Sequence, residues 1–216
     1  YPFDSKGPDL STVVNAPDDV AGIIGRALQG DGTKYVKSTD ASIETKIDGL
    51  GNFTVSFWYK RTNTDAAQMF VWNFGYQDPN VQFGGSGGAY VYHRFYLNDT
   101  ISYYFYEYTP NTIWDWDDGN WHHFVYTFDG SQANADKLKM YYDNVDISTV
   151  IGTLTTAPSA TAIDTTVSEM EIGSNVDGHG PISGSVDLFG FWDWTMTPDD
   201  VAYEYNDGAA QEFVAE

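Results

Sequence analysis

The chain has 216 residues, of which 42% are hydrophobic, so it can bury a sizeable core within a single domain. Its 31 acidic residues outnumber its 10 basic residues and give a formal charge of -21, which repels phosphate backbones and anionic bilayers and argues against nucleic acid as a partner. No stretch has the roughly 18 consecutive apolar residues of a membrane span, and a chain without cysteine has no disulfide or thiol chemistry.

The first half of the chain contains aromatic and β-branched residues that alternate as they do in strands. Short strands are predicted at Thr33–Lys37 and Ser42–Lys46. Asn52–Lys60 is the first strongly alternating strand, and Gln68–Phe74 is predicted to be its neighbour in the sheet. Four large side chains of Asn52–Lys60 share one face: Phe53, Val55, Phe57 and Tyr59.

Aromatic residues are densest in the middle of the chain. Ala89–Leu97 and Thr100–Tyr108 are predicted to form a β-hairpin, with tyrosines on both faces. A loop with two tryptophans, Trp114 and Trp116, then leads into the next strand.

That next strand, Trp121–Gly130 (WHHFVYTFDG), ends in an Asp-Gly turn. Alternation places His122 and Phe124 on one face and His123 and Val125 on the other, and both faces are apolar enough to be at least half buried. Because adjacent side chains on a strand point to opposite faces, the two histidines cannot easily share a metal ion. The pattern favours packing in the middle of a sandwich.

The last third of the chain contains three further predicted strands and one short helix. The strands are Lys137–Tyr142, Ser168–Ile172 and Ser185–Trp192. The helix is predicted at Pro198–Tyr205, because Thr197 can cap its N-terminus and proline is favoured at the first helical position.

Four motifs spread over nearly the whole chain carry a resemblance to a known family. They are Gly22–Val36 (GIIGRALQGDGTKYV), Asn52–Lys60, Trp121–Gly130 and Gly184–Tyr205 (GSVDLFGFWDWTMTPDDVAYEY). Together they resemble the laminin-G-like and pentraxin-like branch of the concanavalin A-like lectin/glucanase superfamily. The resemblance implies an all-β fold, a two-sheet antiparallel jelly-roll sandwich with one short C-terminal helix, in which residues 1–216 form a single domain.

The resemblance also implies a calcium site between two loops. In pentraxin-like members, amide and acidic side chains from two such loops hold the ion, and the corresponding residues here are Asn63, Asp65, Asn175 and Asp177. These are hard oxygen ligands of the kind that calcium prefers, and backbone carbonyls or water would complete the shell. The structural alternative is that Asn and Asp are there because turns require them.

A second calcium position is suggested by related sandwiches, which often clamp their terminal strands with an ion. It would join Asp31 to Asp187 in the closing strand and would be structural.

Aromatic side chains in the predicted loops are the candidates for contact with a ligand: Trp114, Trp116, Tyr76 and His179. An aromatic plane offers apolar contact to a pyranose, while acids and amides bind its hydroxyls. The other aromatic residues are needed to fill the core.

Catalysis is not expected. Glu169 and Glu171 lie two residues apart on one strand face, which is about the separation of an inverting glycosidase pair. The Glu-x-Asp-x-x-Glu strand of related glucanases is nevertheless missing, so a solvated strand face is the preferred interpretation.

The function predicted from these residues is a lectin-like, non-catalytic recognition or adhesion module that binds carbohydrate or a glycosylated surface, with calcium as a candidate cofactor. The alternative is a structural or self-assembling domain of a larger surface, fibre or virion protein. Both hypotheses predict an extracellular or surface-exposed location, on a cell or a virion, without membrane insertion. A chain that begins at Tyr1 without a signal segment is expected of a processed product or an excised module.

Overall fold

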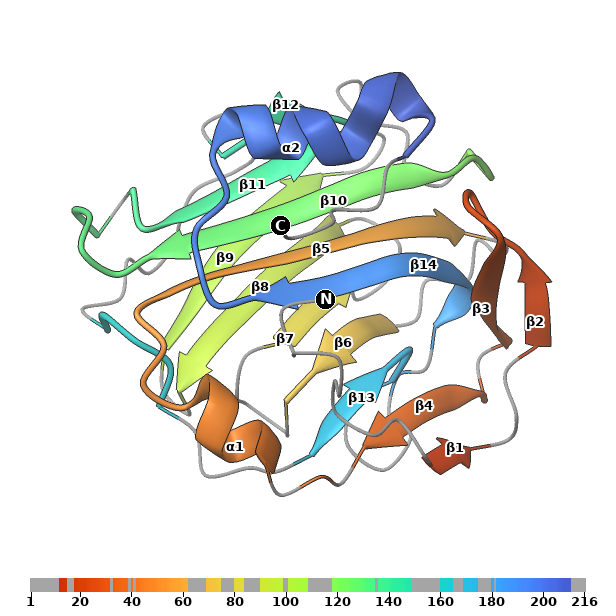
Figure 1. Cartoon of the computed structure of the whole chain (residues 1–216), viewed down its shortest axis with the longest axis horizontal. Helices are drawn as coiled ribbons and strands as arrows, with labels where there is room; N and C mark the ends of the chain where they lie inside the picture. The colour runs from red at the N-terminus through yellow and green to blue at the C-terminus, as the bar shows by residue number, and fades with distance from the viewer. Residues whose placement is uncertain are drawn as a thin grey trace.

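The computed structural model describes residues 12–14, 18–31, 33–38, 40, 42–61, 69–74, 80–83, 90–98, 101–108, 118–134, 136–148, 160–164, 169–174, 180 and 182–210. Over these residues the chain forms two antiparallel sheets of seven strands each, packed face to face (Figure 1). The predicted all-β sandwich is therefore confirmed. Helix α2, Pro198–Tyr205, is the predicted C-terminal helix.

The front sheet, which faces the viewer in Figure 1, has the order β12-β11-β10-β5-β14-β3-β2. Its strands in chain order are β2 (Asp18–Ala21), β3 (Arg26–Asp31), β5 (Asn52–Arg61), β10 (His122–Asp129), β11 (Leu138–Tyr142), β12 (Val145–Asp146) and β14 (Ser183–Trp192).

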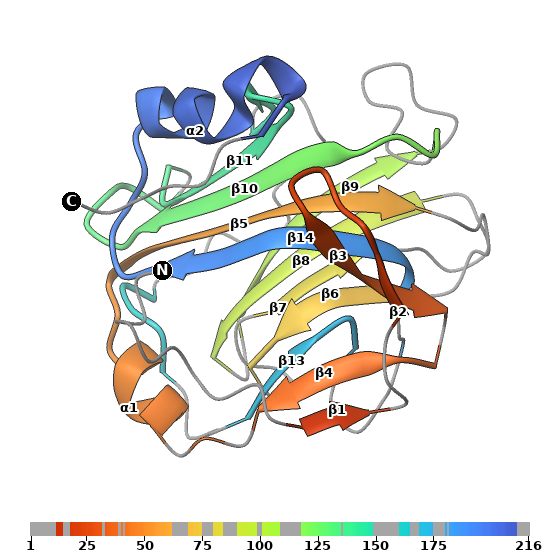
Figure 2. The same ribbon diagram turned by 45° about the vertical axis from the view of Figure 1, so that its right-hand side comes forward.

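The back sheet has the order β1-β4-β13-β6-β7-β8-β9, and Figure 2 shows β4, β13 and β6 side by side. Its strands are β1 (Thr12–Val14), β4 (Tyr35–Ser38), β6 (Met69–Asn73), β7 (Asn80–Phe83), β8 (Tyr90–Asn98), β9 (Ile101–Tyr108) and β13 (Met170–Ile172). The predicted hairpin is the β8–β9 pair, which is confirmed.

The core lies between the two sheets and is rich in aromatic rings. The four side chains predicted to share a face of β5 are all buried in it: Phe53, Val55, Phe57 and Tyr59. Phe53 stacks on Phe128 of β10 at 5.1 Å between ring centroids, while Trp72 of the back sheet meets Phe191 of β14 edge to face at 6.4 Å. Aromatic contacts thus join neighbouring strands and both layers.

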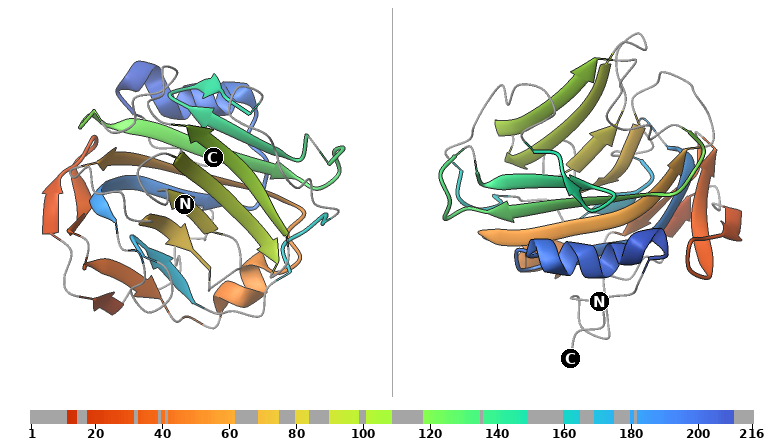
Figure 3. Two further views of the ribbon diagram at one scale, coloured as in Figure 1. Left: turned by 180° about the vertical axis from the view of Figure 1, so that it is seen from behind. Right: turned by 90° about the horizontal axis from the view of Figure 1, so that it is seen from above.

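Helix α2 covers the outer face of the front sheet, as the view from above in Figure 3 shows. A second apolar cluster joins the helix to this sheet: Val125, Tyr141, Trp192, Met196 and Val201. Thr197 accepts a hydrogen bond from the Asp200 backbone N–H, and the Asp200 carboxylate accepts one from the Thr197 N–H. This capping box starts the helix where the sequence predicts it. The 3-10 turn η2, Asn206–Gly208, follows.

The strand predicted at Ser42–Lys46 is wrong, because this segment forms helix α1 (Ser42–Ile47). The Asp40 side chain accepts a hydrogen bond from the Ser42 N–H and begins the turn. Ile43 and Ile47, four residues apart, both lie on the buried face of the helix. None of the described helices is long and apolar enough to cross a membrane.

The pairing predicted for Gln68–Phe74 is also wrong. This segment does form a strand, β6, but it lies in the back sheet between β13 and β7. The neighbours of β5 are β10 and β14, so the chain crosses from one sheet to the other between Arg61 and Met69.

Candidate functional site

The eight side chains predicted to bind calcium or a ligand lie outside the described residues: Asn63, Asp65, Tyr76, Trp114, Trp116, Asn175, Asp177 and His179. What the structure does describe is the set of strand ends that border their segments. These ends show which of the bordering strands are neighbours.

In the back sheet, the end of β13 lies beside the start of β6. The two strands are antiparallel neighbours, with Ile172 opposite Trp72. One step further the Gly173 N–H donates to the Val71 carbonyl at 2.8 Å. Residues 175–179 follow this end of β13, and residues 62–68 precede this end of β6.

In the front sheet, the other ends of the same two connections are also neighbours. Arg61, the last residue of β5, is paired with Gly184 near the start of β14. The Ile182 N–H, just before β14, donates to the Gly173 carbonyl at 2.8 Å and ties the two sheets together. The described strand ends that border the two Asn/Asp segments are therefore neighbours in both sheets.

Asn73, the last residue of β6, contacts the residues that follow β13. Its side chain is buried, and its amide Nδ2 donates to the Ser174 carbonyl, one residue before Asn175. Its carbonyl oxygen Oδ1 has no hydrogen-bond partner within the described part of the chain.

A lysine and two glutamates form an ion-pair cluster on the outer face of the back sheet. Met170 and Ile172 of β13 point into the core, so Glu171 between them points outward. The Lys37 Nζ of β4 lies 3.0 Å from a Glu169 oxygen and 3.5 Å from a Glu171 oxygen.

The solvated strand face predicted for Glu169 and Glu171 is wrong for Glu171, which is only 1% exposed. A buried carboxylate needs a nearby cation, and Lys37 provides it. A glycosidase needs its sugar between the two carboxyl groups, whereas here an ammonium group contacts both. The cluster is therefore built as an ion pair rather than as an acid–base pair.

The structure does not bring Asp31 and Asp187 together, so the clamp predicted between them is wrong. Asp31 is opposite Ser183 on β14, and Asp187 lies four residues further along that strand, a distance of about 13 Å. Asp187 accepts hydrogen bonds from the Ile23 and Ile24 N–H groups at 2.8 and 3.2 Å. Asp31 instead accepts hydrogen bonds from the backbone and hydroxyl of Thr33.

The two adjacent histidines of β10 point to opposite faces, as predicted. His123 is buried under α2, where its Nε2 lies 3.0 Å from the Ser56 hydroxyl. Its ring stacks on Trp58 at 4.9 Å, and Glu204 of α2 lies 3.6 Å from the same nitrogen. This histidine joins the helix to the front sheet.

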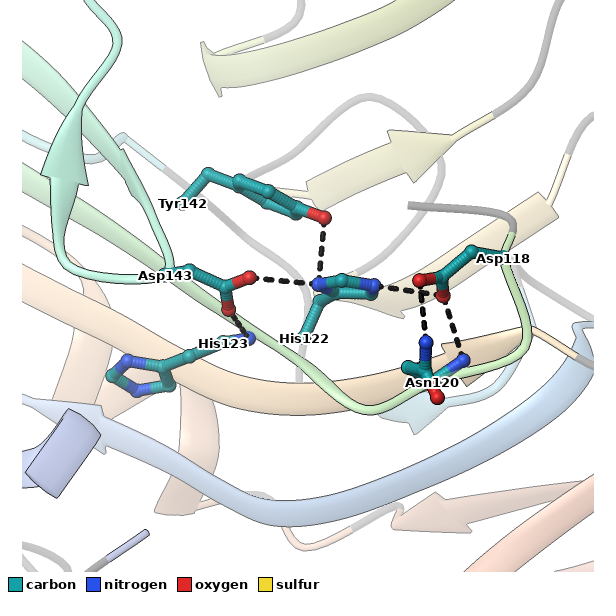
Figure 4. Close-up of polar contacts among 6 residues, drawn as sticks. All are labelled: Asp118, Asn120, His122, His123, Tyr142 and Asp143. Atoms are coloured by element: carbon teal, nitrogen blue, oxygen red, sulfur yellow. Dashed lines mark hydrogen bonds and ion pairs between the residues drawn. The ribbon is translucent and has the colours of Figure 1, made fainter. Parts of the chain in front are cut away.

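His122 lies at the start of β10 between two carboxylates, a cluster that the sequence did not predict (Figure 4). Its Nε2 is 3.0 Å from Asp118 Oδ1, and its Nδ1 is 2.7 Å from Asp143 Oδ2. The Tyr142 hydroxyl is 2.6 Å from the same Nδ1. The sequence gives one indication of this cluster, which is that Asp118 and Asp143 each belong to a turn next to a strand of the front sheet.

The carboxylates favour the charged form of His122. Burial lowers the pKa of this imidazole, but hydrogen bonds and attraction to Asp143 and Asp118 outweigh burial, so its pKa lies above the ordinary value of 6.5. No group of three or more His, Cys, Asp or Glu side chains suited to a metal ion occurs among the described residues.

Comparisons with known proteins agree with this architecture. Residues 30–202 match a family model described as the concanavalin A-like lectin/glucanases superfamily. No curated protein matches the chain.

Three solved structures share the fold at low sequence identity. Domain 4 of AbnA, an extracellular arabinanase from Geobacillus stearothermophilus solved with arabinotriose, is 17% identical with a TM-score of 0.51, over 94% of this chain and 84% of that one. The CBM40 of the Ruminococcus gnavus IT-sialidase, solved with α2,3 sialyllactose, is 13% identical with a TM-score of 0.55, over 81% and 94%. The native heptameric SAP-like pentraxin of Limulus polyphemus is 13% identical with a TM-score of 0.50, over 73% and 70%.

The family match covers most of the sequence, and the two seven-stranded sheets have the architecture that the resemblance implied. This chain belongs to the concanavalin A-like lectin/glucanase superfamily.

Proposed function

We propose that the chain is a non-catalytic, lectin-like module that binds carbohydrate or a glycosylated surface outside the cell, with calcium assisting the binding. Two kinds of support favour a carbohydrate ligand. The family is one of lectins and glucanases, and two structures of this fold were solved with arabinotriose and α2,3 sialyllactose.

The observation that carries the proposal is that the strands bordering the two Asn/Asp segments are neighbours. Their described ends are neighbours in both sheets, through the Gly173–Val71 hydrogen bond and the pairing of Arg61 with Gly184. Calcium requires about 6–8 oxygen ligands, more than one short loop supplies. Two segments bordered by neighbouring strands are a suitable source of them.

In this proposal, four side chains contribute oxygen ligands to the calcium ion: Asn63, Asp65, Asn175 and Asp177. Four others contact the sugar: Tyr76, Trp114, Trp116 and His179. The bound ion would fix the loops and could also bind sugar hydroxyls, and an aromatic ring would cover the apolar face of the pyranose.

The ion-pair cluster supports a binding role rather than hydrolysis. Lys37 contacts both Glu169 and Glu171. The space between the two carboxylates is therefore occupied by an ammonium group and is not free for a sugar. Hydrolysis of a glycoside requires such a pair, with one group as acid and the other as base or nucleophile.

Calcium titration of a paired variant tests the proposal. Isothermal titration and thermal melting, each with calcium or a chelator, should show calcium binding and a higher melting temperature for the wild-type chain. Asp65→Ala with Asp177→Ala should abolish both effects and weaken glycan binding at least about tenfold.

Asp164→Ala with Asp193→Ala is the matched control, because it removes the same charge from two exposed positions of the described chain. If the Asp65/Asp177 variant kept the calcium response and glycan affinity of this control, the proposed site would be wrong. A chain that bound no glycan but assembled with rising concentration in light scattering would instead favour the structural alternative.

A further inference from the structure

His122 is surrounded by groups from four elements of the fold. Asp118 comes from the turn before β10, Asp143 from the turn after β11, and Tyr142 from β11 itself. Tyr59 of β5 is opposite His122 in the register, and its hydroxyl donates to the Ser183 carbonyl at 3.4 Å. Burial keeps the pKa of Tyr59 far above neutrality, so this hydroxyl remains uncharged.

The hydrogen bonds around His122 require a charged ring. An imidazolium has two N–H donors, whereas a neutral imidazole has one donor and one acceptor. Because each ring nitrogen faces a carboxylate, only the charged ring donates to both Asp118 and Asp143.

Nδ1 differs from Nε2 because it has a second partner of another kind. The Tyr142 hydroxyl, 2.6 Å away, has a proton to donate, and the carboxylates do not. When Nδ1 loses its proton, Tyr142 can donate to it, and the ring keeps Nε2–H for Asp118.

We propose that His122 is a proton-controlled clasp that joins the turn at 118–120 to the turn at Asp143 when charged. On deprotonation, Tyr142 replaces Asp143 as the partner of Nδ1. The released proton passes to solvent, and the only covalent bond that breaks is the Nδ1–H bond. The clasp is independent of the carbohydrate-binding proposal.

Each carboxylate keeps other hydrogen bonds when the clasp opens. Asp143 still accepts the His123 backbone N–H at 2.8 Å, and Asp118 still accepts the Asn120 backbone N–H at 2.7 Å. The change is therefore confined to the contact between the two turns. Because the pKa of His122 is raised by its two carboxylate partners, the contact opens at a higher pH than an ordinary imidazole would titrate.

Nitrogen-detected NMR of the histidine rings across a pH series tests the clasp. The wild-type chain should show His122 titrating above 6.5 and, once neutral, carrying its proton on Nε2. Asp143→Asn should lower the midpoint by about 0.5 pH unit or more, because it removes a partner of the charged ring. Tyr142→Phe should raise the midpoint, because it removes the donor that stabilises the neutral ring.

The direction in which Tyr142→Phe shifts the titration midpoint of His122 is the decisive result. A lower or unchanged midpoint in Tyr142→Phe would show that the hydroxyl accepts from the charged ring or does not matter, and would overturn the exchange. A neutral wild-type ring protonated on Nδ1 would overturn it without any variant. The His123 signals, from the opposite face of the same strand, report whether each variant is folded.

Discussion

The two outer faces of the sandwich are closed in different ways. Helix α2 covers the front sheet, and the contact beneath it is an apolar cluster that includes Val125 and Val201. The back sheet instead carries charged side chains, with Lys37 contacting both Glu169 and Glu171.

This difference indicates where recognition is to be sought. A face covered by a capped helix contributes stability, and its buried side chains, apolar and polar alike, are not exposed to a ligand. The back sheet ends in the edge where residues 62–68 and 175–179 border neighbouring strands, and Asn73 and Glu171 place buried polar groups next to that edge. A carbohydrate, which binds through hydroxyls, fits the second environment better.

The largest expected effect comes from the charged face. Lys37→Met should lower the free energy of unfolding by about 3 kcal/mol, because it removes the cation beside the buried carboxylate of Glu171. Urea unfolding measures this. Replacing both residues, Lys37→Met with Glu171→Met, should recover most of the loss, and an equally unstable double variant would show that the charge pair is not the cause.

The apolar cluster between α2 and the front sheet should lose stability when a buried side chain is shortened. Val201→Ala on the buried face of α2 should cost about 2 kcal/mol, because the lost side-chain volume leaves a cavity. Val145→Ala makes the same chemical change at a side chain that is 59% exposed and should cost less than about 0.5 kcal/mol. Equal losses in the two variants would contradict the burial contrast.

The helix cap should have a smaller effect. Thr197→Ala removes the side chain that accepts the Asp200 N–H and should cost about 1 kcal/mol in thermal unfolding. Thr161→Ala, at an exposed position, is the control. A loss of stability no greater than that of the control would mean that packing, and not the cap, stabilises the N-terminus of α2.

The smallest effect depends on pH. The folded-state pKa of His122 is raised, so its stabilisation is fully present below the unfolded value of about 6.5 and is lost as pH rises through the folded value. The free energy of unfolding of the wild-type chain should therefore exceed that of His122→Gln by about 1 kcal/mol or less at pH 5.5. This difference should shrink towards pH 9. A difference that grew with pH would have the wrong sign.

Elements with local signals could be predicted from the sequence. Strand β10 alternates and ends in Asp-Gly, and α2 carries its own capping box, so both lie where they were predicted. The neighbours of β6 could not be predicted, because pairing depends on the crossing between the sheets after Arg61. Helix α1 has 6 residues, fewer than two turns, so its sequence does not show a clear helical period.

Partners distant in sequence explain what was missed around the candidate site. The burial of Glu171 depends on Lys37, which belongs to a strand far earlier in the chain. His122 obtains one carboxylate from its own approach turn and the other from the turn after β11. The Asn/Asp pairs were predicted from motif position. The structure adds that the strands bordering the two segments are neighbours.

Binding of the wild-type chain to a glycan array, with calcium and then with a chelator, tests the central claim most directly. The wild-type chain should bind at least one class of glycan, and the chelator should weaken this binding at least about tenfold. A folded chain that bound no glycan under either condition would contradict it.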